Sequence, residues 1–174
     1  MSQYILAVPP NDPARFKEPN QGCWAAALAS LLNVTKLGVV GYSDIVTQCS
    51  AYMNDDGSIP VPGGTPDTGV GTAGGMSAVC SLYNVLCSTI PCGNFTNAYA
   101  LNILQKKGHA LIMYATDGDL GHVQVMYGVG VPDDSSISIF DPWNQAPDYS
   151  NIPIANVAGS GSEMYIAWAA WAGP

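Results

Sequence analysis

The hydrophobic pattern predicts a buried helix near the start of the chain. No charged side chain occurs between Pro19 and Thr35, and the run from Cys23 to about Val34 is almost wholly apolar. A helix that is apolar on every side is buried on every side. We therefore expect a buried central helix with a cysteine at its N-terminus.

Three more helices are predicted before residue 108, separated by a long loop. The loop, Asn54 to Gly75, is rich in glycine and proline, and it either walls a cleft or is a flexible insertion. The helices are expected from Tyr42 onward with Ser43 as the N-cap, from Met76 to about Cys87 with Val79, Leu82, Tyr83 and Leu86 on one side, and from Ala98 to Lys107, capped by Thr96-Asn97 and ended by Gly108.

After Gly108 the pattern alternates with the period of a strand. Four strands are expected there, at His109–Thr116, His122–Val131, Ser136–Phe140 and Met164–Trp171. A further short strand is expected near the start of the chain, at Tyr4–Val8. Helices followed by an antiparallel meander indicate an α+β fold, with the helices packed on a C-terminal antiparallel sheet. No repeat or linker divides the chain, so one domain over residues 1–174 is expected.

Charge and composition exclude several classes of function. Five Lys and Arg against thirteen Asp and Glu give a net charge of −8, so no basic patch for nucleic acid or for an anionic membrane surface is expected. No signal peptide or transmembrane segment is recognisable. The protein is therefore expected to be cytoplasmic or exported by a signal-independent route, and its oligomeric state stays open.

Cys23 is the candidate nucleophile, although a buried structural thiol is the alternative. A helix N-terminus favours the thiolate, which is the reactive form, by about 0.3–1 kcal/mol and by up to about 2 kcal/mol in partly buried geometries. That gain alone does not make a fully formed nucleophile, so Cys23 needs a cationic partner, normally a histidine.

The chain has two histidines, and each follows a glycine at the start of a predicted strand. A hairpin that turns at residues 132–134 brings the start of the His122 strand next to Asp141, where a carboxylate holds and stabilises the imidazole. His109 is expected in a similar position on the preceding strand, without a carboxylate. An ordinary half-buried histidine remains the alternative for His122, and Asn144 is an alternative orienting residue to Asp141.

Three segments, taken in order, resemble the papain-like cysteine peptidases. They are Cys-Trp-Ala-Ala at the start of the apolar helix, Gly-His-Val-Gln-Val-Met-Tyr-Gly on a strand, and Ile-Phe-Asp-Pro-Trp at the end of the next strand. The likeness spans about Gln21 to Trp143 and is to small bacterial members, such as bacteriocin-leader peptidases and secreted effectors. It implies a papain-like fold with Cys23 as nucleophile, His122 as general base and acid, and Asp141 as the orienting residue.

The oxyanion hole departs from that family. A glutamine usually lies about six residues before the cysteine, where this chain has Lys17. Either Gln21 or Asn20 serves with the backbone N–H of Cys23, or the hole is incomplete. Losing one such donor costs about 10²–10³-fold in rate.

The sequence therefore predicts a cysteine peptidase that acts on a protein or peptide without a metal or a cofactor. The same triad serves effector-type acyltransferases, deamidases and transglutaminases, and a catalytically weak binding module on a papain-like fold is the other alternative. Cys80, Cys87 and Cys92 lack a Cys-x-x-Cys pair. We expect them to be core thiols, with the first two on one helix face, rather than metal ligands.

Overall fold

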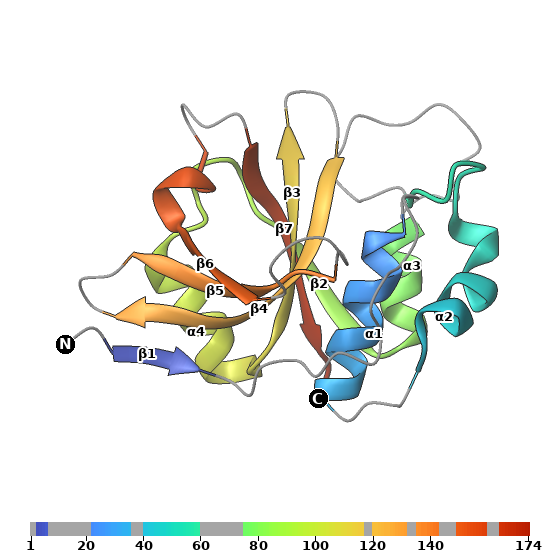
Figure 1. Ribbon diagram of the computed structural model, residues 1–174, viewed down its shortest axis with the longest axis horizontal. Coiled ribbons are helices and arrows are strands. Elements are labelled where there is room, and N and C mark those ends of the chain that lie inside the picture. Colours follow the sequence, from blue (N-terminus) through green and yellow to red (C-terminus); the bar gives the residue numbers. More distant parts are fainter. Residues whose placement is uncertain are drawn as a thin grey trace.

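A computed structural model describes residues 3–6, 22–35, 40–59, 75–116, 120–131, 135–142, 149–159 and 164–174. Helices and an antiparallel sheet form the α+β arrangement expected from the sequence (Figure 1). The elements are β1 (Gln3–Leu6), α1 (Cys23–Thr35), α2 (Tyr42–Gln48), a 3₁₀ turn (Ser50–Tyr52), α3 (Gly75–Leu82), β2 (Val85–Thr89), α4 (Asn97–Lys107), β3 (Ala110–Thr116), β4 (Leu120–Val131), β5 (Ser136–Phe140), β6 (Tyr149–Pro153), a second 3₁₀ turn (Ile154–Asn156) and β7 (Met164–Ala172).

The strands form one seven-stranded sheet in the order β2-β7-β3-β4-β5-β6, with β1 paired to β4. Every pairing is antiparallel. Strands β3, β4 and β5 follow one another as the meander that the sequence predicts. Strand β7 departs from it, because it returns to the other side of β3 and lies between β3 and β2.

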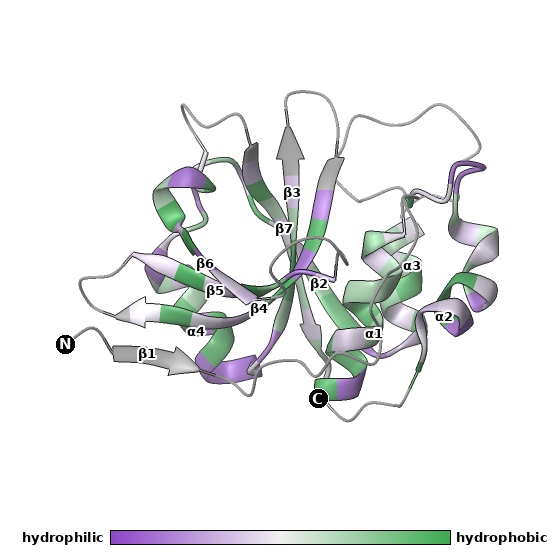
Figure 2. Cartoon of the chain, viewed as in Figure 1, coloured by the Kyte–Doolittle hydropathy of each residue, from purple (hydrophilic) through white to green (hydrophobic). Residues whose placement is uncertain are grey.

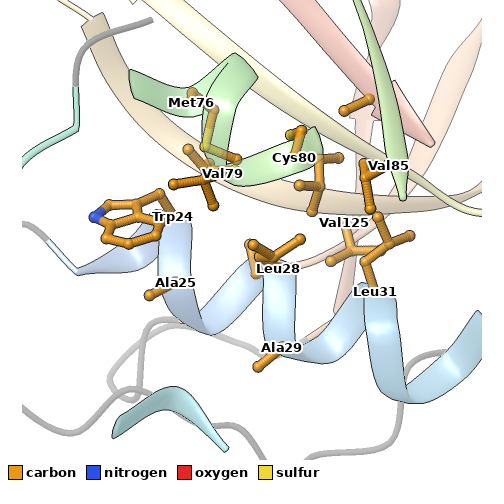
Figure 3. Packing of buried hydrophobic residues seen from close by; sticks show 14 of the residues in the cluster. Trp24, Ala25, Leu28, Ala29, Leu31, Met76, Val79, Cys80, Val85 and Val125 are labelled. Atoms are coloured by element: carbon orange, nitrogen blue, oxygen red, sulfur yellow. The ribbon is translucent and has the colours of Figure 1, made fainter. Parts of the chain in front are cut away.

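Helix α1 is buried as expected. All residues from Trp24 to Leu32 are buried, because the helix lies between the sheet and the helices α2 and α3 (Figure 1). Figure 3 shows Leu28 and Leu31 facing α3 and the sheet, with Ala29 on the opposite side of the helix. The apolar surface on every side of α1 therefore has a partner, which fixes where its N-terminus lies.

A second apolar cluster fills the other face of the sheet, under α4. Thr96 caps α4 by accepting a hydrogen bond from the Tyr99 N–H, and Gly108 ends the helix at a φ of 79°. Figure 2 shows mainly hydrophobic residues on α1 and α3, whereas hydrophilic residues lie on α2 and toward the end of α4. No helix among the described residues is long and apolar enough to cross a membrane.

The predicted helix from Met76 to about Cys87 is wrong in its second half. Helix α3 ends at Leu82, Asn84 takes a left-handed conformation at φ 54°, and the chain continues as strand β2. Leu82 and Leu86, expected on one side of a single helix with Val79, lie in different elements and are 57% and 46% exposed. Pairing of β2 with β7, about eighty residues further along, overrides the local helical pattern.

Two smaller features also differ from the sequence interpretation. The N-cap of α2 is Gly41, whose N–H donates to the carboxylate of Asp44 at 3.2 Å, so Ser43 lies inside the helix. Strand β6 was not expected, because its residues alternate between exposed and half-buried positions and carry little apolar signal.

Candidate active site

Cys23 is the first residue of α1, and the carbonyl of Gly22 closes the first turn. That carbonyl accepts hydrogen bonds from the N–H groups of Ala25 and Ala26 at 3.1 and 3.2 Å. Cys23 is half-buried, whereas the rest of the helix up to Leu32 is fully buried. The thiol thus lies at the edge of the core and at the positive end of the helix.

Trp24 ties a neighbouring turn to the start of α1. Its indole Nε1 donates to the carbonyl of Gly57 at 3.0 Å. The turn is closed by two hydrogen bonds between the backbones of Asn54 and Ser58 and of Gly57 and Asn54, at 2.9 and 3.0 Å. The first part of the long loop is therefore anchored beside Cys23, and residues 60–74 of that loop lie outside the described part of the chain.

His122 and Asp141 lie together, as their places in the predicted hairpin led us to expect. The imidazole Nε2 is 2.7 Å from Oδ1 of Asp141. The register explains the contact: Val125 of β4 pairs with Phe140 of β5, so the residue after β5 meets the first part of β4.

A β-bulge occurs where His122 enters the sheet. Met113 pairs with Val123 and Ala115 pairs with Leu120, so residues 121 and 122 together stand opposite Tyr114 alone. Such bulges kink a strand and re-aim side chains next to active sites.

Two residues that the sequence analysis did not single out complete the hydrogen-bond network. The Gln124 Nε2 donates to Oδ2 of Asp141 at 2.7 Å, and the Tyr114 hydroxyl donates to Oε1 of Gln124 at 2.7 Å. Tyr114, Gln124 and Asp141 are only 1%, 7% and 8% exposed. The available signal was a lone glutamine two residues after His122 in an otherwise apolar strand.

The network favours the protonated imidazole. Burial alone would lower the pKa of His122, but hydrogen bonds to Asp141 and to the Cys23 side chain, together with their charges, raise that pKa to about 9. Asp141 contacts Nε2 of the ring, and the Cys23 side chain is a second hydrogen-bond partner of the same imidazole. Burial and the Asp141 charge raise the pKa of Tyr114, which keeps its hydroxyl a donor at neutral pH.

The expected place of His109 is wrong. Ala110 pairs with Met126, so His109 lies near the far end of β4, about five residues or roughly 17 Å along the strand from His122. Neighbouring antiparallel strands begin at opposite edges of a sheet, so two histidines at strand starts cannot share an edge. His109 is buried and belongs to no part of this site.

The predicted oxyanion residue Gln21 lies outside the described residues, as do Asn20, Lys17 and the alternative orienting residue Asn144. Their roles stay predictions.

The other cysteines form no metal site in the described part of the chain, where no group of three or more metal-binding side chains occurs. Cys80 lies on α3 and Cys87 on β2, so the expected shared helix face is wrong. The two thiols are hydrogen-bonded, which lowers the pKa of Cys87 to about 6, while the same bond and burial raise the pKa of Cys80. Cys92, also expected in the core, is exposed.

Comparison with known proteins places the chain in a family. A solved double-glycine-motif protease from an AMS/PCAT transporter, in complex with its leader peptide, is similar at 17% identity and a TM-score of 0.48, with 94% of this chain and 96% of that chain covered. No curated protein matches the sequence significantly. The family described as papain-like cysteine protease AvrRpt2 matches residues 8–152. The chain therefore belongs to this family of papain-like cysteine proteases, and its helices packed on an antiparallel sheet form a papain-like fold.

Proposed function

We propose that this peptidase hydrolyses peptide bonds through a Cys23–His122–Asp141 triad and a thioester intermediate. The observation that carries the proposal is the 2.7 Å contact between His122 and Asp141, made on a ring that also hydrogen-bonds the Cys23 side chain. A thiol, an imidazole and a carboxylate in that order supply a nucleophile, a proton carrier and an orienting group.

In the acylation step, Cys23 and His122 react as a thiolate–imidazolium pair, in which Nδ1 of His122 holds the proton of the thiol and Asp141 stabilises the imidazolium. The sulfur of Cys23 attacks the carbonyl carbon of the scissile bond and forms a tetrahedral oxyanion. The imidazolium then gives its proton to the leaving amine as the C–N bond breaks. The products are a free amine and a thioester on Cys23.

In the deacylation step, a water takes the place of the amine. The imidazole removes one proton from the water, the oxygen attacks the thioester carbonyl, and the C–S bond breaks to release the carboxylic acid. The thiolate and the imidazolium are restored for the next cycle.

The backbone N–H of Cys23, at the first position of α1, is proposed as one oxyanion donor. The first N–H groups of a helix have no acceptor within the helix, and the helix dipole favours negative charge there. The amide side chain of Gln21 or Asn20 is proposed as the second donor.

The pH dependence of hydrolysis should have its alkaline limb near pH 9. A raised pKa means that His122 keeps its proton up to about pH 9, and above that pH the imidazolium that protonates the leaving amine is lost. The dependence of kcat/KM on pH, measured on one cleaved peptide, checks this. An alkaline limb near 6.5, the ordinary histidine value, would contradict it.

The direct test is cleavage of a peptide library with and without a peptidyl epoxide. We expect cleavage by the untreated protein, its loss after treatment at neutral pH, and one adduct at Cys23, located by mass spectrometry of a digest. Cleavage that persists in protein fully modified at Cys23 would rule out this nucleophile.

Cys87 and Cys80 provide matched controls for the labelling. Iodoacetamide should also modify Cys87, because its thiol is half-buried and its pKa is lowered to about 6. Buried Cys80 should react slowly. Loss of cleavage should follow the extent of modification at Cys23 and not at Cys87.

A further inference from the structure

We propose that Gln124 and Tyr114 are positioning residues that hold Asp141, and through it His122, in the orientation required by the proposed triad reaction. The inference rests on that reaction, but part of its test needs no substrate. The carrying observation is a continuous row of short hydrogen bonds from Tyr114 through Gln124 and Asp141 to His122, each 2.7 Å long.

The second carboxylate oxygen of Asp141 explains why Gln124 is needed. Oδ1 faces His122 and Oδ2 accepts from Gln124, and Asp141 is only 8% exposed. A buried carboxylate oxygen without a donor favours protonation or rotation of the group. The Gln124 amide removes both tendencies, so Asp141 stays ionised with Oδ1 directed at the imidazole.

The hydroxyl of Tyr114 explains why the Gln124 amide has the correct orientation. An amide can rotate by half a turn and present its oxygen instead of its NH₂ group to Asp141, which would be repulsive. Oε1 carries no proton, so the buried Tyr114 hydroxyl must be the donor to it. That bond selects the orientation in which the NH₂ group faces the carboxylate.

Register irregularities on both sides fix the position of Tyr114 itself. The β3–β4 pairing shifts between Met113 and Ala115, and the β3–β7 pairing shifts between Met113 and Tyr114. Tyr114 is 1% exposed and packs in the apolar cluster under α4. The network is thus held by a buried part of the sheet.

The kinetic test replaces the two residues singly and together. Gln124→Leu should lower kcat about ten- to a hundredfold with little change in KM, since a hydrogen bond to a charged group is lost. Tyr114→Phe should have a smaller effect. In the Gln124→Leu background, Tyr114→Phe should cost nothing further, because its hydroxyl acts only through Gln124.

Gln124→Glu keeps the size of the side chain and tests the role of charge. Two adjacent carboxyl groups share one proton at low pH and repel each other once both ionise. This variant should keep activity on the acid side and lose it as pH rises, so that its alkaline limb lies below that of wild type. Gln124→Leu, which lacks a donor at every pH, should lose activity on the acid side as well.

An NMR titration of the imidazoles measures the positioning without any substrate. The titratable groups near His122 in the described structure are Cys23 from α1, Asp141 after β5, and Tyr114 from β3. Gln124→Leu should lower the pKa of His122 from about 9. His109, at the other end of β3, is the internal control and should titrate as in wild type.

These readouts separate the two proposals. A lowered His122 pKa in a protein that cleaves no peptide would support the positioning role and overturn the proposed hydrolysis. Cleavage by wild type, with an unchanged His122 titration and unchanged kcat in Gln124→Leu and Tyr114→Phe, would overturn the positioning role. Additive losses in the double variant would also overturn it, because the two side chains would then act independently.

Discussion

Replacing Cys23 with alanine is expected to lower peptide hydrolysis by about 10⁴-fold or more, the scale of losses when a triad nucleophile is removed. The variant cannot form the thioester, and any remaining turnover must come from direct attack by water. The fold should survive, because Cys23 is half-buried at the first position of α1 and alanine favours a helix. The measurements are kcat/KM on a library-derived peptide and the intact mass of the protein during turnover.

Cys92→Ala is the matched control for this variant. It removes a thiol at an exposed position outside the proposed triad. The rate of hydrolysis and the intact mass of the protein during turnover should both match those of the wild type, apart from the mass of the substitution itself. Hydrolysis at an undiminished rate in Cys23→Ala would show that another group is the nucleophile.

Replacing Asp141 with asparagine is expected to lower kcat by about 10³–10⁴-fold, comparable to the loss of the orienting carboxylate in a serine protease triad. The amide has no charge to stabilise the imidazolium. Its NH₂ group, placed toward Nε2, would force the ring proton onto Nδ1, where it blocks transfer from the Cys23 thiol. The pKa of His122, about 9 in the native protein, should fall, and the alkaline limb should move to lower pH with it.

Asp56→Asn is the control for charge alone, because Asp56 is an exposed carboxylate on the turn next to α1. It should leave kcat and the alkaline limb unchanged. An Asp141→Asn variant that keeps its kcat, beside an Asn144→Ala variant that loses it, would move the orienting role to Asn144.

The proximity of His122 and Asp141 could be predicted because it depends on local pattern and on one short hairpin. Alternating apolar residues locate β4 and β5, and the antiparallel register then decides which ends meet. The same holds for α1, whose apolar residues leave it no exposed face.

The rest of the site depends on which strands pair in the sheet, and the local sequence pattern of one strand does not say which strand becomes its partner. The bulge at residues 121 and 122 lies where His122 enters the sheet, and it arises only when β3 and β4 pair. Helix α3 gives way to β2 because β7 supplies a partner strand from far along the chain. His109 lies away from the site because β3 and β4 run in opposite directions, so the two strands begin at opposite edges of the sheet.

The position of β7 inside the sheet, between β2 and β3, has a consequence for the order of events during synthesis. Strand β7 pairs with both β2 and β3, and its end is held where the Gly173 N–H donates to the carbonyl of Asn84 at 2.7 Å. A nascent chain that stops before Met164 already carries all three groups of the proposed triad, yet β2 has no partner strand and one edge of β3 is open. The ribosome therefore completes the three groups of the proposed triad before it supplies the strand that pairs with both β2 and β3.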